Sequence, residues 1–202
     1  MRSACSPPSL LVDGDGGFPR IHPFWVGGRI HSMETDDIIF EGGYVLRPAT
    51  EQDIDAIVAL LAADALRADV EAGGADRRSA YLNAFRAIAA DPAHLLMVVD
   101  HGSRVVGTMQ LSFLPGLSRG GATRLQVEAV RVADDLRSRG IGRAMILWAV
   151  DEGRRRGVAL VQLTSDARRT QAHRFYDRLG FEASHVGFKL HLDGLPEDRP
   201  GG

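Results

Sequence analysis

The chain has 202 residues, of which 45% are hydrophobic and 25% charged, and its formal net charge is −2. These values are typical of one soluble globular domain with tails. No apolar run approaches the roughly 20 residues that a membrane-spanning helix requires. No apolar core of a secretory signal follows Arg2 either, so neither a membrane partner nor secretion is expected.

Both ends of the chain differ in composition from its middle. Residues 1–42 are rich in glycine, proline and aspartate and lack a sustained hydrophobic period, which predicts a flexible leader. The segment DGLPEDRPGG, residues 193–202, predicts a disordered tail. The folded domain is therefore expected over residues 43–192.

The first half of the domain is expected to hold one strand and two helices. A short strand is predicted over 43–49. A helix over 50–67 follows, with Thr50 as its N-cap and Asp53 three residues on, close to a capping box. A second helix is predicted over 79–90, where an Asp-Pro pair ends it.

The second half alternates strands with helices. Three successive strands are followed by helix, strand, helix and strand. The order β-α-α-β-β-β-α-β-α-β predicts an α/β architecture with a mixed sheet. The predicted ranges are 94–100, 104–114 and 123–132 for the three strands, then 140–157 (helix), 159–165 (strand), 171–180 (helix) and 185–192 (strand).

The loop LRSRGIGRA, residues 136–144, follows a predicted strand and opens a predicted helix. The first N–H groups of a helix have no partner within it, and the helix dipole favours negative charge there. Gly140 and Gly142 allow a phosphate to approach the backbone closely, and the three arginines of the loop add charge-assisted hydrogen bonds. The loop therefore predicts a phosphate or pyrophosphate site.

The charge around this loop is positive. Residues 137–178 contain ten arginines and four acidic residues, a net charge of +6. A basic segment in a nearly neutral chain indicates a local anionic ligand rather than nucleic-acid binding. A solvated helix face accounts equally well for many of these arginines taken one by one.

The residues around Gly142 argue against two other phosphate loops. A Walker loop needs Gly-Lys-Ser/Thr, but Arg143 and Ala144 follow this glycine. A dinucleotide fingerprint needs a third glycine where Met145 stands, and it belongs to the first βαβ unit of its fold. The remaining pattern is Arg-x-x-Gly-x-Gly, which begins at Arg137.

Two motifs, in order and at the expected spacing, resemble the GNAT superfamily of N-acetyltransferases. Arg-x-x-Gly-x-Gly is the pyrophosphate loop of that family, and the strand EAVRV stands directly before it. The segment AHRFYDRLGFE, residues 172–182, resembles the family's second motif, Ala-x-x-Phe-Tyr-x-x-Leu-Gly-Phe. The resemblance covers about residues 43–192 and implies a GNAT-type mixed, mostly antiparallel sheet flanked by helices.

The resemblance also implies the reactants and the residues that hold them. Acetyl-CoA is the expected co-substrate, and a primary amine of a small molecule, peptide or protein is the expected acceptor. Tyr176 matches the tyrosine that protonates the leaving thiolate. The positions expected to hold acetyl-CoA are Val130, Arg131 and Val132 along pantetheine, Arg137, Ser138, Arg139, Gly140, Ile141, Gly142, Arg143 and Ala144 around the pyrophosphate, and Arg169 and His173 near the second motif.

Two positions depart from the family pattern. Arg169 stands where the family often has an asparagine that contacts acetyl-CoA, and Asp134 stands where a proline is common. Neither lies in the glycine loop. The departures leave the contacts made at Arg169 open.

Direct attack of an amine on a thioester needs a base, an oxyanion donor and an acid. Glu128 is the candidate base, because it is a lone acid in an apolar strand. A solvent-facing position, or a salt bridge to Arg131 or Arg124, explains it equally. A backbone N–H at a bulge near Val130 is the candidate oxyanion donor.

Tyr176 and His173 each have a second interpretation. The pKa of a tyrosine, about 10, suits an acid that protonates a thiolate, but Phe175 and Phe181 flank Tyr176, which is also typical of an aromatic core. His173 is a candidate second proton carrier or a surface histidine.

Other residues limit the remaining possibilities. Cys5 is the single cysteine, which excludes an internal disulfide framework and fits a reducing, cytoplasmic location. His94 and His101 have no accompanying carboxylate cluster, so no metal is expected. The alternative to catalysis is a non-catalytic acyl-CoA-binding module. The oligomeric state stays open, with a homodimer as one outcome.

Overall fold

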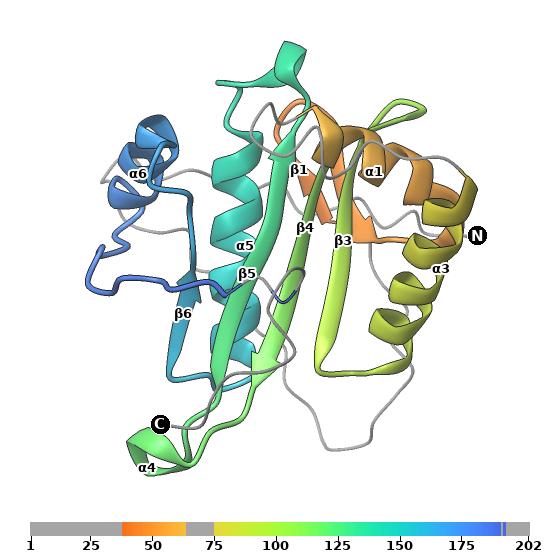
Figure 1. The fold of residues 1–202 in the computed structure, drawn as a ribbon. Coiled ribbons are helices and arrows are strands. Elements are labelled where there is room, and N and C mark those ends of the chain that lie inside the picture. The colour runs from red at the N-terminus through yellow and green to blue at the C-terminus, as the bar shows by residue number, and fades with distance from the viewer. Residues whose placement is uncertain (1–37, 64–74, 191, 193–202) are drawn as a thin grey trace, which may run out of the picture. The chain divides into compact units, whose positions relative to one another are not determined.

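The computed structural model describes residues 38–63, 75–190 and 192. In this part of the chain six strands form one sheet, in which their spatial order is their sequence order (Figure 1). All neighbouring strands are antiparallel except β5 and β6, which are parallel. The predicted mixed, mostly antiparallel sheet is thus confirmed. The strands are β1 (Ile38–Phe40), β2 (Tyr44–Pro48), β3 (His94–His101), β4 (Arg104–Leu114), β5 (Arg124–Val132) and β6 (Leu160–Leu163).

Helices connect and cover the strands. Figure 1 shows α1 and α3 next to β3, and α5 along β5. Helix α1 contacts β4 and β5, α3 contacts β3, and α5 contacts β4, β5 and β6. The helices are η1 (Glu51–Asp53), α1 (Ile54–Ala62), α3 (Ala75–Ala90), α4 (Ser118–Gly121), η2 (Asp134–Leu136), α5 (Ile141–Arg155) and α6 (Thr170–Asp177), where η marks a 3₁₀ turn.

Helices α1 and α5 lie on opposite faces of the sheet. A Cβ built on Gly107 of β4 would lie 3.3 Å from both Val99 on β3 and Met145 on α5, so this face packs against α5. Leu46 on β2 pairs with Val99 and shares that face. Arg47 follows it and points to the other face, because side chains alternate along a strand.

The hydrophobic core lies mainly between the sheet and α5. Its central residues come from β2 to β5 and from one stripe of α5. Met145, Ile146 and Ala149 form that stripe, and their helical spacing places them together on the sheet. The largest fully buried apolar side chains are Leu46, Val98, Val99, Val106, Met109, Leu111, Leu125, Val127, Met145 and Ile146.

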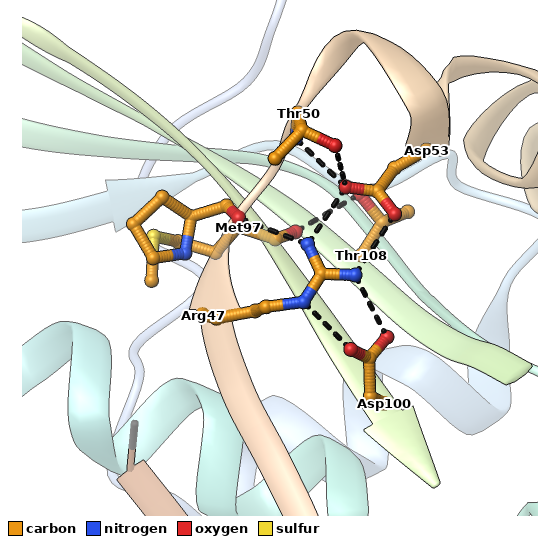
Figure 2. A network of polar contacts seen from close by, with 7 residues as sticks. Arg47, Thr50, Asp53, Met97, Asp100 and Thr108 are labelled. Atoms are coloured by element: carbon orange, nitrogen blue, oxygen red, sulfur yellow. Dashed lines mark hydrogen bonds and ion pairs between the residues drawn. The ribbon is translucent and has the colours of Figure 1, made fainter. Parts of the chain in front are cut away.

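Arg47 joins three elements on the opposite face (Figure 2). Its Nη1 and Nη2 donate to the carboxylate of Asp53 at 2.7 and 2.9 Å, and its Nε donates to Asp100 at 2.6 Å. Asp53 in turn accepts from the backbone N–H and the hydroxyl of Thr50 at 2.7 and 2.9 Å. The predicted capping box is present, and Arg47 ties it to β2 and β3.

Three segments differ from their predictions in extent or type. Ile38–Phe40, inside the expected leader, form a strand that turns into β2 through Gly42 and Gly43, whose φ angles are +87° and +75°. Helix α3 begins at Ala75 rather than at residue 79. The loop after β4 contains the short turn α4.

The predicted last strand, 185–192, is wrong for the residues that can be judged. Residues 185–190 and 192 have no strand conformation and pair with no other strand. The alternation of apolar and polar residues is there, but a strand also needs a backbone partner, which sequence periodicity does not supply. The expected leader up to residue 37, residues 64–67 of the first helix and the tail 193–202 lie outside the described residues.

Candidate active site

Strand β5 carries a bulge next to the predicted site. Thr108 pairs with Arg131 and Gln110 pairs with Glu128, so one residue of β4 faces two residues of β5. Ala129, in the bulge, has a φ of 52°, a left-handed conformation that is uncommon for a residue with a Cβ. The predicted bulge near Val130 is confirmed. A bulge re-aims the backbone N–H groups beside it.

The second half of β5 has one free edge. Pairing between β5 and β6 ends at Val127 and Leu163, whereas β5 continues to Val132. Within the described residues, positions 128–132 therefore have a neighbouring strand on the β4 side only. The backbone groups along this edge can pair with an extended, amide-containing ligand in the manner of an added strand.

The loop after β5 presents a row of unbonded amides. The N–H groups of Leu136 and Arg137 donate to carbonyls of the turn, and Ala144 N donates to the Gly140 carbonyl at 2.9 Å. In the described part of the chain, the six amides at 138–143 between them donate to no protein acceptor. Ser138 and Gly140 have φ angles of 64° and 82°, which shape the loop ahead of α5. Such a row of N–H groups at a helix N-terminus binds phosphate oxygens.

Among the described residues, five of the ten arginines in the basic segment form ion pairs with a carboxylate. Arg139 and Arg143, which flank the row of amides, form no ion pair with a described residue. Both line a hollow between α5 and the β1–β2 hairpin, together with Phe40 and Tyr44. Two arginines of the segment thus add positive charge beside the loop, in a hollow that Glu41 also lines. The arginines in ion pairs are Arg137 (with Asp134), Arg154 (with Asp151), Arg155 and Arg156 (both with Glu152) and Arg168 (with Asp166).

Helix α6 places Tyr176 against the same end of the sheet. Phe175, the preceding residue, packs near Gly142 of α5 and Val132 of β5: a Cβ added at Gly142 would lie 3.7 and 3.8 Å from them. The Tyr176 ring lies edge-to-face with Phe175 and Phe181, at centroid distances of 5.1 and 5.8 Å. Both interpretations of Tyr176 therefore hold in part, because its ring packs in an aromatic cluster while its hydroxyl remains a candidate acid.

Burial raises the pKa of the Tyr176 hydroxyl, and the nearby guanidinium groups of Arg131 and Arg169 oppose that shift. The net effect keeps the hydroxyl protonated at neutral pH, so it is available as a proton donor. The effect of these two guanidinium groups on the pKa shows that Arg131 and Arg169, both predicted from the sequence, lie near the Tyr176 hydroxyl.

Glu128 is exposed and lies one residue before the bulge. It faces Gln110 across the β4–β5 pair and forms no ion pair within the described residues. In the described part of the chain no ion pair joins it to Arg124 or Arg131, and its exposure fits the solvent-facing interpretation as well as that of a base. Its carboxylate is thus accessible beside the free edge of β5.

The remaining predicted residues have local roles. Arg131 Nη1 donates to the Val130 carbonyl at 2.8 Å. His173 is exposed, and its Nε2 lies 2.8 Å from the carbonyl of Asp166, which fixes the loop before α6. This contact favours the structural interpretation of His173. Arg169, half-buried, immediately precedes α6.

The contact between Gly142 and Phe175 was missed by sequence reasoning, although the Phe-Tyr pair of the second motif was its signal.

Among the described residues, no three histidine, cysteine, aspartate or glutamate side chains come together as a metal site. No helix in the described ranges has the length and apolarity to cross a membrane.

Comparison with known proteins identifies the family. The model of the acetyltransferase (GNAT) family matches residues 59–181. An aminoalkylphosphonate N-acetyltransferase of Salmonella typhimurium is 30% identical over 144 residues, covering 71% of this chain and 88% of the relative. A glucosamine 6-phosphate N-acetyltransferase of Trypanosoma brucei brucei is 33% identical over 89 residues, 44% of this chain and 58% of that protein.

A solved structure extends the match to the fold. A protein described as a transcriptional regulator from Bacillus halodurans C-125 superposes with a TM-score of 0.71 at 38% identity, covering 74% of this chain and 99% of that one. Family model, relatives and fold agree with the family that the two motifs indicate. The chain belongs to the GNAT family of acetyltransferases.

Proposed function

We propose that the chain transfers the acetyl group of acetyl-CoA to the primary amine of a small molecule that carries a phosphonate or phosphate group. One observation carries the proposal. The free edge of β5, the unbonded amides at 138–143 and Tyr176 meet at one end of the sheet, joined by the contact of Gly142 with Val132 and Phe175.

The donor half of the site fits acetyl-CoA. The amides of 138–143, with Arg139 and Arg143 beside them, suit the two negative phosphates of a pyrophosphate. The free edge at 129–132 suits the amide groups of pantetheine, which would run as an extra strand along β5. This path directs the thioester toward the bulge and toward Tyr176.

The reaction is direct transfer. The amine nitrogen attacks the thioester carbonyl, and the C–S bond breaks as the new C–N bond forms. Glu128 takes the amine's proton, directly or through water, and a backbone N–H of the Ala129–Val130 bulge stabilises the oxyanion. Tyr176 donates its proton to the thiolate and recovers one from solvent.

The acceptor class rests on chemistry shared by two relatives. One is named for an aminoalkylphosphonate and the other for glucosamine 6-phosphate, and both compounds pair an amine with a phosphorus oxyanion. Arg131 lies on the same face of β5 as Glu128, since both face the α1 side through their partners Thr108 and Gln110. We assign Arg131 as the candidate that binds the acceptor's anion, a role beyond its expected contact with acetyl-CoA.

Calorimetric titration with acetyl-CoA, followed by a free-thiol assay, tests the proposal. The matched acceptors are an aminoalkylphosphonate and the same aminoalkyl chain without the phosphonate, then glucosamine 6-phosphate and glucosamine. We expect acetyl-CoA to bind and the phosphorus-containing amines to have the higher kcat/KM. A charged group bound by arginine is worth about 1.5–3 kcal/mol, which predicts a preference on the order of 10- to 100-fold.

Each alternative has its own result. Equal turnover of both members of each pair contradicts the assigned acceptor class, and turnover of peptides alone contradicts the small-molecule acceptor. Acetyl-CoA binding without thiol release across amines and peptides supports the non-catalytic acyl-CoA-binding module. No binding of acetyl-CoA contradicts the donor site itself.

A further inference from the structure

A row of polar side chains crosses four neighbouring strands of the sheet, β3 to β6 (Figure 1). Gln126 on β5 pairs with Ser112 on β4 and with Gln162 on β6. On its other side, Ser112 pairs with His94 on β3. Paired residues of neighbouring strands point to the same face of a sheet, so these four side chains form one line across it.

The row lies on the face of the sheet that carries Glu128. Leu125, the residue before Gln126, points to the opposite face, because a Cβ built on Gly153 of α5 would lie 3.3 Å from the Leu125 side chain. Side chains alternate along a strand, so Gln126 and Glu128 both point away from α5, and two residues along a strand span about 7 Å. An acceptor whose amine lies at Glu128 therefore has the row within its reach.

Hydrogen bonds within the row fix its side chains. The amide of Gln162 donates to the carbonyl oxygen of Gln126 at 2.8 Å. Ser112 Oγ lies 2.9 Å from His94 Nδ1. Ser112 is buried and both glutamines are half-buried. The two amides are thus held in place by each other and remain accessible to a bound molecule.

The chemistry of the amide pair selects the kind of group that it binds. Two glutamine side chains have four N–H groups and two carbonyl oxygens, and the bond between them uses one N–H and one oxygen. The pair therefore combines donors with acceptors and has no charge. A hydroxyl group both donates and accepts hydrogen bonds, so it uses both kinds of partner. A phosphate would use only the donors and an ammonium group only the acceptors.

We propose that Gln126 and Gln162 bind a hydroxyl group of the acceptor, on the side of the amine that lies away from the phosphorus group. The inference rests on the proposed function, in which Glu128 takes the amine's proton and Arg131 binds the anion. Along β5, Glu128 stands between the amide pair and Arg131. The acceptor is thereby narrowed to phosphorus-containing amines with a hydroxyl beside the amine-bearing carbon.

The test compares two acceptors that differ in a single hydroxyl. In 2-amino-3-hydroxypropylphosphonate the hydroxyl lies on the side of the amine away from the phosphonate, and 2-aminopropylphosphonate of matching configuration lacks it. Release of the free thiol from acetyl-CoA gives kcat/KM of the full chain for each compound. We expect the wild type to prefer the hydroxylated compound by about 10-fold, because the other compound leaves the amide pair without its hydrogen-bonding partner.

Two variants test the glutamines themselves. Gln126→Met and Gln162→Met each remove one amide and keep a side chain of similar length. In each variant the preference should fall close to unity, because methionine donates no hydrogen bond. The ratio between two acceptors cancels any loss of activity that affects both, such as partial unfolding. Gln52→Met, which changes an exposed glutamine of η1, is the matched control and should keep the wild-type ratio.

Each contrary result has its own meaning. Equal kcat/KM of the two compounds with the wild type overturns the hydroxyl site and leaves the proposed acetyl transfer to phosphorus-containing amines intact. A wild-type preference that persists in either methionine variant overturns the assignment to the amide pair. Acetylation of neither compound overturns the proposed function and the hydroxyl site with it.

Discussion

Gly142 on α5 faces Phe175 on α6 across the candidate donor site, and a Cβ built on the glycine would lie 3.7 Å from the Phe175 ring. This separation is an ordinary van der Waals contact, so the site accepts a methyl group but has no room for a longer side chain without displacing Phe175 or entering the phosphate position. Substitutions of increasing size at residue 142 therefore test how much space the donor site leaves beside Phe175.

We expect Gly142→Ala to retain acetyl-CoA affinity within a few-fold and Gly142→Glu to lose it by about 10²-fold or more. The glutamate would place a negative charge beside the pyrophosphate, and like charges in contact cost several kcal/mol. Calorimetry with acetyl-CoA measures both. Equal affinity of the glutamate variant and the wild type would contradict the pyrophosphate assignment of the loop.

Tyr176→Phe tests the proton donor. The variant keeps the ring that packs on Phe175 and Phe181 and removes only the hydroxyl, so the fold and the acetyl-CoA affinity should remain. A general acid contributes about 10²- to 10⁴-fold, and we expect kcat to fall by about 10²-fold or more. Tyr81→Phe, on α3, is the matched control and should keep full activity. Full activity of Tyr176→Phe would assign the residue to packing alone.

The pKa of Tyr176 adds a prediction on pH. Because burial raises it above the ordinary value of 10.0, the hydroxyl stays a proton donor to a higher pH than an exposed tyrosine does. The loss of wild-type kcat that comes from this group should therefore begin at a higher pH than for an ordinary tyrosine. A basic limb at lower pH that disappears in Tyr176→Phe would contradict the burial argument.

Glu128→Gln tests the candidate base. The amide keeps the size of the side chain but accepts no proton, so kcat/KM should fall by about 10²-fold. The defect should shrink as pH rises, because more of the acceptor amine then arrives already neutral. Glu182→Gln, exposed beyond α6, is the control. A defect of constant size across pH would indicate a positioning role instead.

Local signals explain most of what the sequence predicted. Strand β4 matches its expected range, because a tight turn precedes it and its residues alternate between apolar and polar. Helix α5 matches its expected range closely, because the glycine loop marks its start and an apolar stripe runs along it. The loop, the bulge and Tyr176 belong to short motifs whose geometry depends on neighbouring residues. For these elements, the residues adjacent in sequence are enough to predict the structure.

The failures have a different physical cause. Whether 185–192 or Ile38–Phe40 becomes a strand depends on a backbone partner, which the pattern of the segment itself does not identify. The bonds of Arg47 to Asp100 join residues 53 positions apart, which no local pattern indicates. The contact of Gly142 with Phe175 likewise depends on how α6 docks against α5.

The ion pair of Asp53 with Arg47 makes the stability of the fold depend on pH in the acid range. Hydrogen bonding to the Arg47 guanidinium holds the pKa of this carboxyl at about 2, against an ordinary value of 3.8, despite the opposing effect of burial. The folded state therefore favours the ionised form. The resulting stability is fully present above pH 3.8 and is lost as pH falls through about 2. A shift of this size corresponds to about 2 kcal/mol.

Asp53→Asn should therefore lower the free energy of unfolding at pH 7 by at least about 2 kcal/mol, because it also leaves part of the Arg47 guanidinium without its charged partner. Urea unfolding of wild type and variant at pH 7, 4, 3 and 2 measures the difference, which should narrow between pH 4 and pH 2. Asp55→Asn is the matched control: its side chain is 71% exposed in its ion pair with Arg78, and such surface pairs contribute at most about 1 kcal/mol. A wild-type advantage over Asp53→Asn that stays constant from pH 7 to pH 2 would show that the Arg47–Asp53 bond acts through packing rather than through charge.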